Sequence, residues 1–255
     1  MTLLERYCYG ERDEVWAELR STGERVREEP LFSEAQAVLR EAMNRVRDNV
    51  QTIVGYLESE GYRFGTYQRD NTPFGEVEPH QDFSEAPLGM PAPDILERIE
   101  AFEAKFGAIP LSLRMFWEVV GSVNLVGHHP DFYYLNDPLL IGSVEELESV
   151  TSEEYFFDGC DIVGADLILA PGIYLKGDVA DGDSFAMRIP NRCLDGKLEE
   201  LHYGLSFLEY LRLCFRCGGF PGYSLDLKHR FSQPEIQRHK IPEPLQNLSA
   251  SLKPI

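Results

Sequence analysis

The sequence predicts an α+β fold, and three observations lead to this prediction. Apolar residues recur at helical spacing on both sides of a run of short β-rich segments between about 122 and 203. Helices and strands that are segregated along a chain in this way are typical of an antiparallel sheet packed against helices. The chain has 255 residues, of which 43% are hydrophobic, so it is long enough to bury a sizeable core.

The N-terminal part of the chain, residues 1–65, is predicted to form a helical extension. Its longest helix should begin at the capping-box pattern Ser33-Glu34-Ala35-Gln36 and end near Gly61. Apolar residues three or four positions apart then form one stripe along the helix: Val38, Ala42, Val46, Val50, Ile53, Val54 and Leu57. Because an apolar stripe must be covered, we expect this helix to pack against another part of the fold.

Residues 66–93 contain several prolines and no helical period, so they are predicted to form an irregular connector. Helical spacing returns at Asp94, which is placed to cap a helix that ends at Gly107. A shorter helix should follow and end at Gly121. These two helices open the region 94–223, which we predict to be an α+β domain.

Four β-rich runs follow, separated by turn residues: 139–142, 161–170, 173–180 and 184–189. Asp181-Gly182, between the last two runs, is a strong signal for a hairpin turn. After the strands, Ser206 is placed to cap a helix that closes at Gly218-Gly219. Residues 224–255 contain four prolines and no clear period, and we expect them to form an extended or partly mobile tail.

The segment Ile95–Pro110 resembles the opening of the SUKH superfamily, which includes a yeast cell-wall-assembly regulator and many bacterial toxin-immunity proteins. In that family an apolar and acidic helix is followed by a glycine, an aliphatic-proline pair and a second helix with aromatic residues. The aromatic residues of the second helix are here Phe116 and Trp117. Three later segments also look similar: Asp137–Leu139, Asp183–Pro190 and Leu208–Arg212.

This resemblance covers residues 94–222, and the N-terminal part of the chain has no counterpart in the minimal family domain. It implies an antiparallel, strongly curved sheet of about six strands packed against helices. It also implies a binding module rather than an enzyme, since many bacterial members are thought to bind and neutralise a toxin. The chain departs from the family where the second helix ends, because Gly121-Ser122-Val123-Asn124 replaces the usual Asn-Gly.

The charge of the chain narrows the class of partner. With 24 basic and 43 acidic residues the formal net charge is −19, which argues against a nucleic-acid binder, whose affinity comes from neutralising phosphates. Residues 131–200 alone contain 16 acidic and four basic residues. Such a field would attract a basic protein, and a nuclease-like toxin has a basic surface because it holds phosphates. The alternative interpretation is a solvated acidic surface without a partner.

The candidate partner-binding residues lie in this acidic stretch. The acidic candidates are Asp158, Asp161, Asp166, Asp178, Asp181 and Asp183. Tyr155 and Phe156, followed by Phe157, could supply the buried aromatic anchors on which affinity depends. The alternative for this aromatic run is a core strand.

No catalytic residue, metal ligand or cofactor is predicted. Cys214 and Cys217 have metal or redox spacing, but a second such pair is absent, which favours buried thiols. His128-His129-Pro130-Asp131 could gather ligands in a loop, yet adjacent side chains rarely face one metal. The acidic stretch Asp178–Asp183 lacks the Asp spacing and the closing Glu of an EF-hand. No Gly-x-Ser-x-Gly motif occurs.

The sequence therefore predicts a non-enzymatic protein-binding module, an immunity protein that neutralises a basic bacterial toxin through an acidic surface. One alternative is a regulatory or scaffold adaptor that docks through its N-terminal helices, and another is an enzyme or small-ligand binder with an unrecognised site. Five cysteines and no recognisable signal peptide favour the cytoplasm. No run of 18 apolar residues occurs, so no membrane contact is expected.

Overall fold

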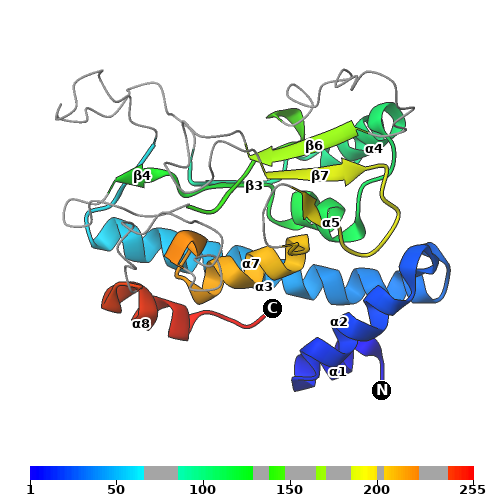
Figure 1. Cartoon of the computed structure of the whole chain (residues 1–255), viewed down its shortest axis with the longest axis horizontal. Helices are drawn as coiled ribbons and strands as arrows, with labels where there is room; N and C mark the ends of the chain where they lie inside the picture. Colours follow the sequence, from blue (N-terminus) through cyan, green and yellow to red (C-terminus); the bar gives the residue numbers. More distant parts are fainter. Residues whose placement is uncertain (66–85, 129–137, 147–164, 171–184, 200–203, 224–240) are drawn as a thin grey trace.

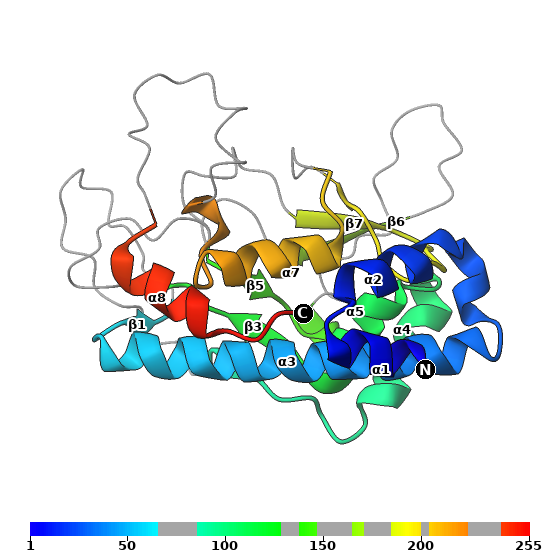
Figure 2. The ribbon, with the colours of Figure 1, turned by 90° about the horizontal axis from the view of Figure 1, so that it is seen from below.

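The computed structural model describes seven ranges of the chain: 1–65, 86–128, 138–146, 165–170, 185–199, 204–223 and 241–255. The longest helix runs along the length of the molecule, with the short strands on one side of it and the first and last helices on the other (Figure 1). Seen from below, the last two helices lie beside the longest one and in front of the strands (Figure 2). The described residues thus form a helical layer and a layer of strands.

The longest helix, α3 (Leu31–Ser59), confirms the helix predicted for this region. Six residues of its predicted stripe are at most 2% exposed: Val38, Ala42, Val46, Val50, Ile53 and Leu57. The predicted cap at Ser33 is wrong, because the helix begins at Leu31 and the residue before it is Pro30. Proline suits a helix start because its missing N–H would have no partner there. The Ser33 hydroxyl instead donates to the Glu29 carboxylate at 2.8 Å.

Three short helical elements precede α3. They are α1 (Leu3–Tyr9), α2 (Arg12–Ser21) and the 3₁₀ helix η1 (Gly23–Arg27). Tyr7 of α1 and Trp16 of α2 are buried and meet edge to face, with ring centroids 5.5 Å apart. The helical character predicted for the N-terminal part is therefore confirmed as far as the end of α3.

The two helices predicted to open the α+β region are confirmed as α4 (Ile95–Phe106) and α5 (Leu111–Val119). The Asp94 side chain does not cap α4 but pairs with Arg98 at 2.9 Å. After α5 the chain turns at Gly121, whose φ is +91°. A Cβ atom at this position would lie 2.0 Å from the Gly89 carbonyl oxygen, so only glycine fits the turn.

The strands of the described residues form three small sheets, and the predicted curved sheet of about six strands is wrong. One sheet pairs β1 (Arg63–Phe64) with β4 (Gly127–His128). The second has the order β2-β3-β5, and the third has the order β6-β7-β8. Their strands are β2 (Leu88–Gly89), β3 (Ser122–Asn124), β5 (Leu140–Ile141), β6 (Ala165–Ala170), β7 (Phe185–Ile189) and β8 (Leu198–Glu199).

The prediction failed because the strands are short and two of them come from segments in which no strand was predicted. β1 comes from the part predicted to be helical and β2 from the predicted connector, and each takes up a strand edge that a larger sheet would need. Three of the predicted runs contain β5, β6 and β7, whereas 173–180 and the Asp181-Gly182 turn lie outside the described residues. A single backbone hydrogen bond, from Gly142 N–H to the Leu169 carbonyl, joins the two three-stranded sheets.

The helix predicted after Ser206 is confirmed as α7 (Phe207–Arg216), and η2 (Pro221–Tyr223) follows it. The tail predicted to be extended is wrong over α8 (Glu243–Ser251). The prolines of this tail predicted that no helix would form there. Pro244, however, stands in the first turn of α8, where proline is tolerated. The buried residues Leu245 and Leu248 give α8 its apolar face.

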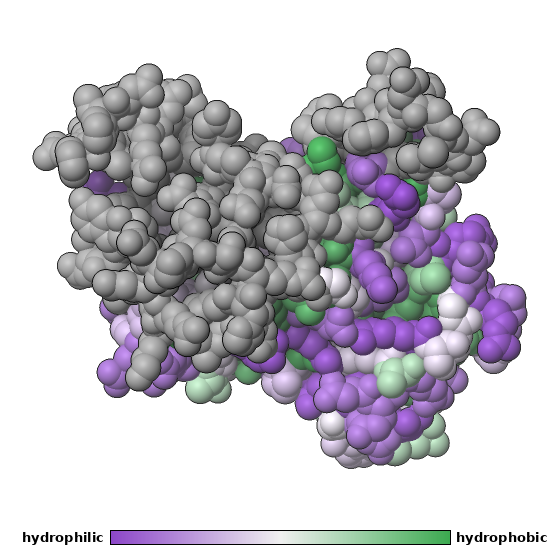
Figure 3. All heavy atoms as spheres, in the orientation of Figure 1, coloured by the Kyte–Doolittle hydropathy of each residue, from purple (hydrophilic) through white to green (hydrophobic). Residues whose placement is uncertain are grey.

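Buried apolar residues from Leu3 to Ile255 belong to one continuous cluster, to which α1, α3, α5 and α7 all contribute. The predicted boundaries after residues 65, 93 and 223 stay predictions. In the part of the chain that the structure describes, no helix is both long and apolar enough to span a bilayer. The described surface of α1 and α2 is mainly hydrophilic on the face drawn in Figure 3.

Candidate functional site

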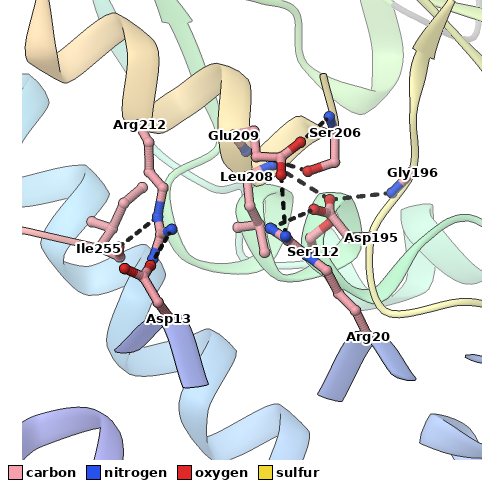
Figure 4. A network of polar contacts seen from close by, with 10 residues as sticks. All are labelled: Asp13, Arg20, Ser112, Asp195, Gly196, Ser206, Leu208, Glu209, Arg212 and Ile255. Carbon is pink, nitrogen blue, oxygen red and sulfur yellow. Dashed lines mark hydrogen bonds and ion pairs between the residues drawn. The ribbon is translucent and has the colours of Figure 1, made fainter. Parts of the chain in front are cut away.

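A largely buried polar network centres on Asp195, in the segment between β7 and β8 (Figure 4). The side chain of Asp195 is only 3% exposed. Its Oδ1 atom accepts hydrogen bonds from the Ser112 hydroxyl at 2.9 Å and from the Gly196 and Leu208 backbone N–H groups at 3.1 and 3.4 Å. One carboxylate therefore ties together α5, its own loop and the first turn of α7.

The second carboxylate of the network is Glu209, which belongs to the cap of α7. Ser206 and Glu209 form a capping box, in which each side chain bonds the other residue's backbone N–H. Arg20 of α2 reaches both carboxylates, since its Nη1 lies 3.2 Å from Glu209 Oε1 and its Nη2 lies 3.7 Å from Asp195 Oδ2. Arg20 thereby links the N-terminal helices to the α5–α7 region.

The two carboxylates differ in their affinity for protons. Burial raises the pKa of Asp195 above its ordinary value, although hydroxyl groups of Ser206 and Ser112 and the charge of Arg20 oppose the shift. For Glu209, burial acts in the same direction, but the Ser206 backbone N–H and Arg20 together outweigh it and lower the pKa of Glu209. Asp195 is thus the carboxylate on which burial acts more strongly.

A second arginine makes a parallel link nearby. Arg212 of α7 pairs with the Asp13 carboxylate of α2 at 2.8 Å, and its Nε donates to the Ile255 backbone oxygen, also at 2.8 Å (Figure 4). Asp13 is 84% exposed, so this ion pair adds little to stability. Its geometry nevertheless places α2, α7 and the last residues of the sequence side by side.

The arrangement around Asp195 fits a structural role better than a catalytic one. A general base needs a free lone pair aimed at a substrate proton. Three donors already occupy Oδ1 of Asp195, and Oδ2, which accepts no hydrogen bond, is buried 3.7 Å from Nη2 of Arg20, where a substrate does not reach it. We therefore regard this network as the connection that positions the N-terminal helices on the rest of the fold.

The residues predicted to bind a partner are not tested by this structure. Asp158, Asp161, Asp178, Asp181, Asp183, Tyr155 and Phe156 lie outside the described residues. Asp166, on β6, is described, and it pairs with Arg188 of the neighbouring strand at 3.5 Å. Both side chains are roughly half exposed, so this candidate is partly committed to a cross-strand pair.

The positions considered for metal or redox chemistry are partly described. Cys214 and Cys217 are both buried at the end of α7, as the buried-thiol interpretation expects. His128 lies on β4, whereas the rest of its predicted loop lies outside the described residues. Among the residues that are described, no group of three His, Cys, Asp or Glu side chains is arranged to hold a metal ion.

Sequence reasoning missed Arg20, Ser112 and Asp195. Of this network, only the cap of α7 can be recognised in the sequence, because Ser206 stands three residues before Glu209. Nothing in the sequence links Asp195 to Arg20, which lies 175 residues earlier. Comparison with known proteins finds no matching family, no similar curated protein and no similar solved structure. The resemblance to the SUKH superfamily therefore stays a prediction.

Proposed function

We propose that this chain is a non-enzymatic protein-binding module that captures a basic protein, a toxin of nuclease type, through acidic segments on its strand side. The observation that carries the proposal is the distribution of charge relative to the fold. Five of the segments outside the described residues contain 16 acidic and two basic residues: 66–85, 129–137, 147–164, 171–184 and 200–203. All the predicted contact residues except Asp166, which lies on β6, belong to these segments.

The strands and helices that flank these acidic segments show where each segment joins the fold. The first segment follows β1 and precedes β2, and the second connects β4 to β5. The fourth connects β6 to β7, which pair antiparallel. These three segments, which contain ten of the 16 acidic residues, are therefore inserted between strands, whereas 147–164 lies between a helical stretch and β6, and 200–203 leads from β8 to α7. A partner with a basic surface would be attracted to the strand side of the molecule.

The structure gives less support to the adaptor alternative. That alternative needs the N-terminal helices as a docking surface, but the apolar stripe of α3 is already buried within this chain. Deleting residues 1–65 would remove this stripe from the core, so it would unfold the protein rather than test docking. The enzyme alternative lacks a described group poised for chemistry, since Asp195 is held by structural donors.

The test starts from the full chain, immobilised and exposed to lysate of its own host at low salt. Proteins eluted by a salt gradient are identified, and the basic candidate is purified for kinetic measurements. Replacing Asp178, Asp181 and Asp183 with asparagine should lower its association rate by roughly three- to tenfold, because three attracting charges are lost.

A matched control removes three charges elsewhere. Glu14, Glu58 and Glu60 are exposed on α2 and at the end of α3, so their replacement by glutamine changes the net charge equally. The control should leave the association rate within about twofold of the original. Equal rates in the two variants, or no stoichiometric basic partner at all, would overturn the proposal.

A further inference from the structure

The last four residues, Leu252–Ile255, lie between α3 and α7 and are held there by polar contacts (Figure 2). Asn49 of α3 is 1% exposed, and its side-chain amide pairs with the backbone of Lys253 in both directions. Its Nδ2 donates to the Lys253 carbonyl at 2.8 Å, and its Oδ1 accepts from the Lys253 N–H at 2.7 Å. The buried Asn49 amide thus forms the same two hydrogen bonds with the Lys253 backbone that a neighbouring β-strand would form.

The next two residues are held through their backbone as well. Arg45 Nη1 donates to the Pro254 carbonyl at 3.1 Å, and Arg212 Nε donates to the Ile255 oxygen at 2.8 Å. The Lys253 ammonium pairs with Asp48 at 2.6 Å, and the Ile255 side chain is only 5% exposed. We call the four residues Arg45, Asp48, Asn49 and Arg212 the arm site.

This set of contacts follows the logic of peptide recognition. Side chains satisfy the backbone of three consecutive residues, which gives affinity, while an ion pair and an apolar position select the sequence. The buried Asn49 amide needs such a partner, because an unpaired buried amide costs about 1–3 kcal/mol. The arm site therefore suits an extended segment with a lysine, a proline and an aliphatic residue in succession.

The last four residues are not restricted to the arm site of their own chain by the residues that connect them to η2. We call residues 241–255, which comprise α8 and the last four residues, the arm. The arm is joined to η2 by 17 residues, 224–240. A chain of that length can span at most about 58 Å, and the 29-residue helix α3 is about 44 Å long. The linker is therefore long enough to reach a neighbouring molecule.

We infer that the arm site is a peptide-binding site and that its ligand in trans is the arm of a second copy of this chain. Every contact of the arm can be formed equally well by two chains that exchange arms, because the same surfaces are used. The chain's own arm competes at an effective concentration of about millimolar, so exchange is suppressed in dilute solution.

The test uses the full chain with a protease site introduced between residues 224 and 240. The folded protein is cut, and a fluorescent synthetic peptide of residues 241–255 is added while its anisotropy is measured. The cut chain should bind this peptide at least about tenfold more tightly than the intact chain, because the tethered competitor has been released. Asn49→Ala should weaken binding to the cut chain by about 10- to 100-fold, since two buried hydrogen bonds are lost.

Gln51→Ala is the matched control, because Gln51 lies on the same helix but is exposed, and it should leave the affinity unchanged. The inference is overturned if the cut chain stays folded by circular dichroism but takes up no peptide, or if Asn49→Ala binds as well as the original. If cutting unfolds the chain, co-purification of two differently tagged intact chains after incubation at high concentration decides. Mixed complexes that Asn49→Ala abolishes support exchange, and their absence refutes it.

Discussion

Replacing Asp195 with alanine should lower the free energy of unfolding by about 3–5 kcal/mol. The change leaves the Ser112 hydroxyl and the Gly196 N–H, which now donate at 2.9 and 3.1 Å, without an acceptor in a buried site. Each orphaned donor costs about 1–3 kcal/mol, and the Leu208 bond at 3.4 Å adds less. Arg20 adds to this cost, because its Nη2, which faces Asp195 Oδ2 at 3.7 Å, is buried although the side chain as a whole is 32% exposed.

The pH dependence of the same site has a defined sign. Because burial raises the pKa of Asp195, the folded chain binds this proton more readily than the unfolded chain does. Its contribution to stability is therefore fully present below the ordinary pKa of aspartate and is lost as the pH rises through the raised value. Asparagine does not titrate. The stability of the original protein minus that of Asp195→Asn should accordingly fall as the pH rises from about 4 to about 7.

Urea unfolding at several pH values, followed by far-ultraviolet circular dichroism, measures both effects. The difference between the original protein and Asp195→Asn cancels the titration of the other carboxylates. A difference that grows with pH would show that the attraction of Arg20 outweighs burial. A loss below about 1 kcal/mol for Asp195→Ala would show that the network does not hold the helices together.

Two further substitutions test packing elsewhere. Arg114→Met should lower the free energy of unfolding by about 2–4 kcal/mol. Arg114 pairs with the largely buried carboxylates of Glu103 and Glu118 at 2.6 and 3.1 Å, and the change would remove the cation that both of them contact. An unchanged midpoint of thermal unfolding would contradict this prediction. Gly121→Ala should cost at least about 2 kcal/mol and loosen the β2–β3 pair, since its Cβ would overlap the Gly89 carbonyl; hydrogen exchange at β3 that stays as slow as in the original would argue against it.

The helices were predictable because each has a local signal. The stripe of α3, the glycines after α4 and α5, and Ser206 before α7 all depend on residues within a few positions of one another. The cap of α3 was predicted three residues too late, at Ser33, because Pro30 was not recognised as a helix-start residue. Similarly, prolines near α8 were interpreted as breakers although one occupies its first turn.

The sheets and the buried network could not be predicted, because they depend on contacts between distant residues. β1 pairs with a strand that begins at Gly127, and no local pattern in Arg63-Phe64 specifies that partner. Two-residue strands also fall below the length at which alternation can be detected. Asp195 looks like any loop aspartate in the sequence, and only the folded chain shows that it is buried beside Ser112.

The position of α3 has a consequence for synthesis of the chain. Its stripe is complete at Leu57, but α7, which contributes to the same buried cluster, ends about 160 residues later. At about 5–20 residues per second, translation of that stretch takes on the order of 10–30 s. During this interval the part of the buried cluster that α7 supplies is missing, so ribosome-associated chaperones should bind the growing chain between the appearance of α3 and that of α7.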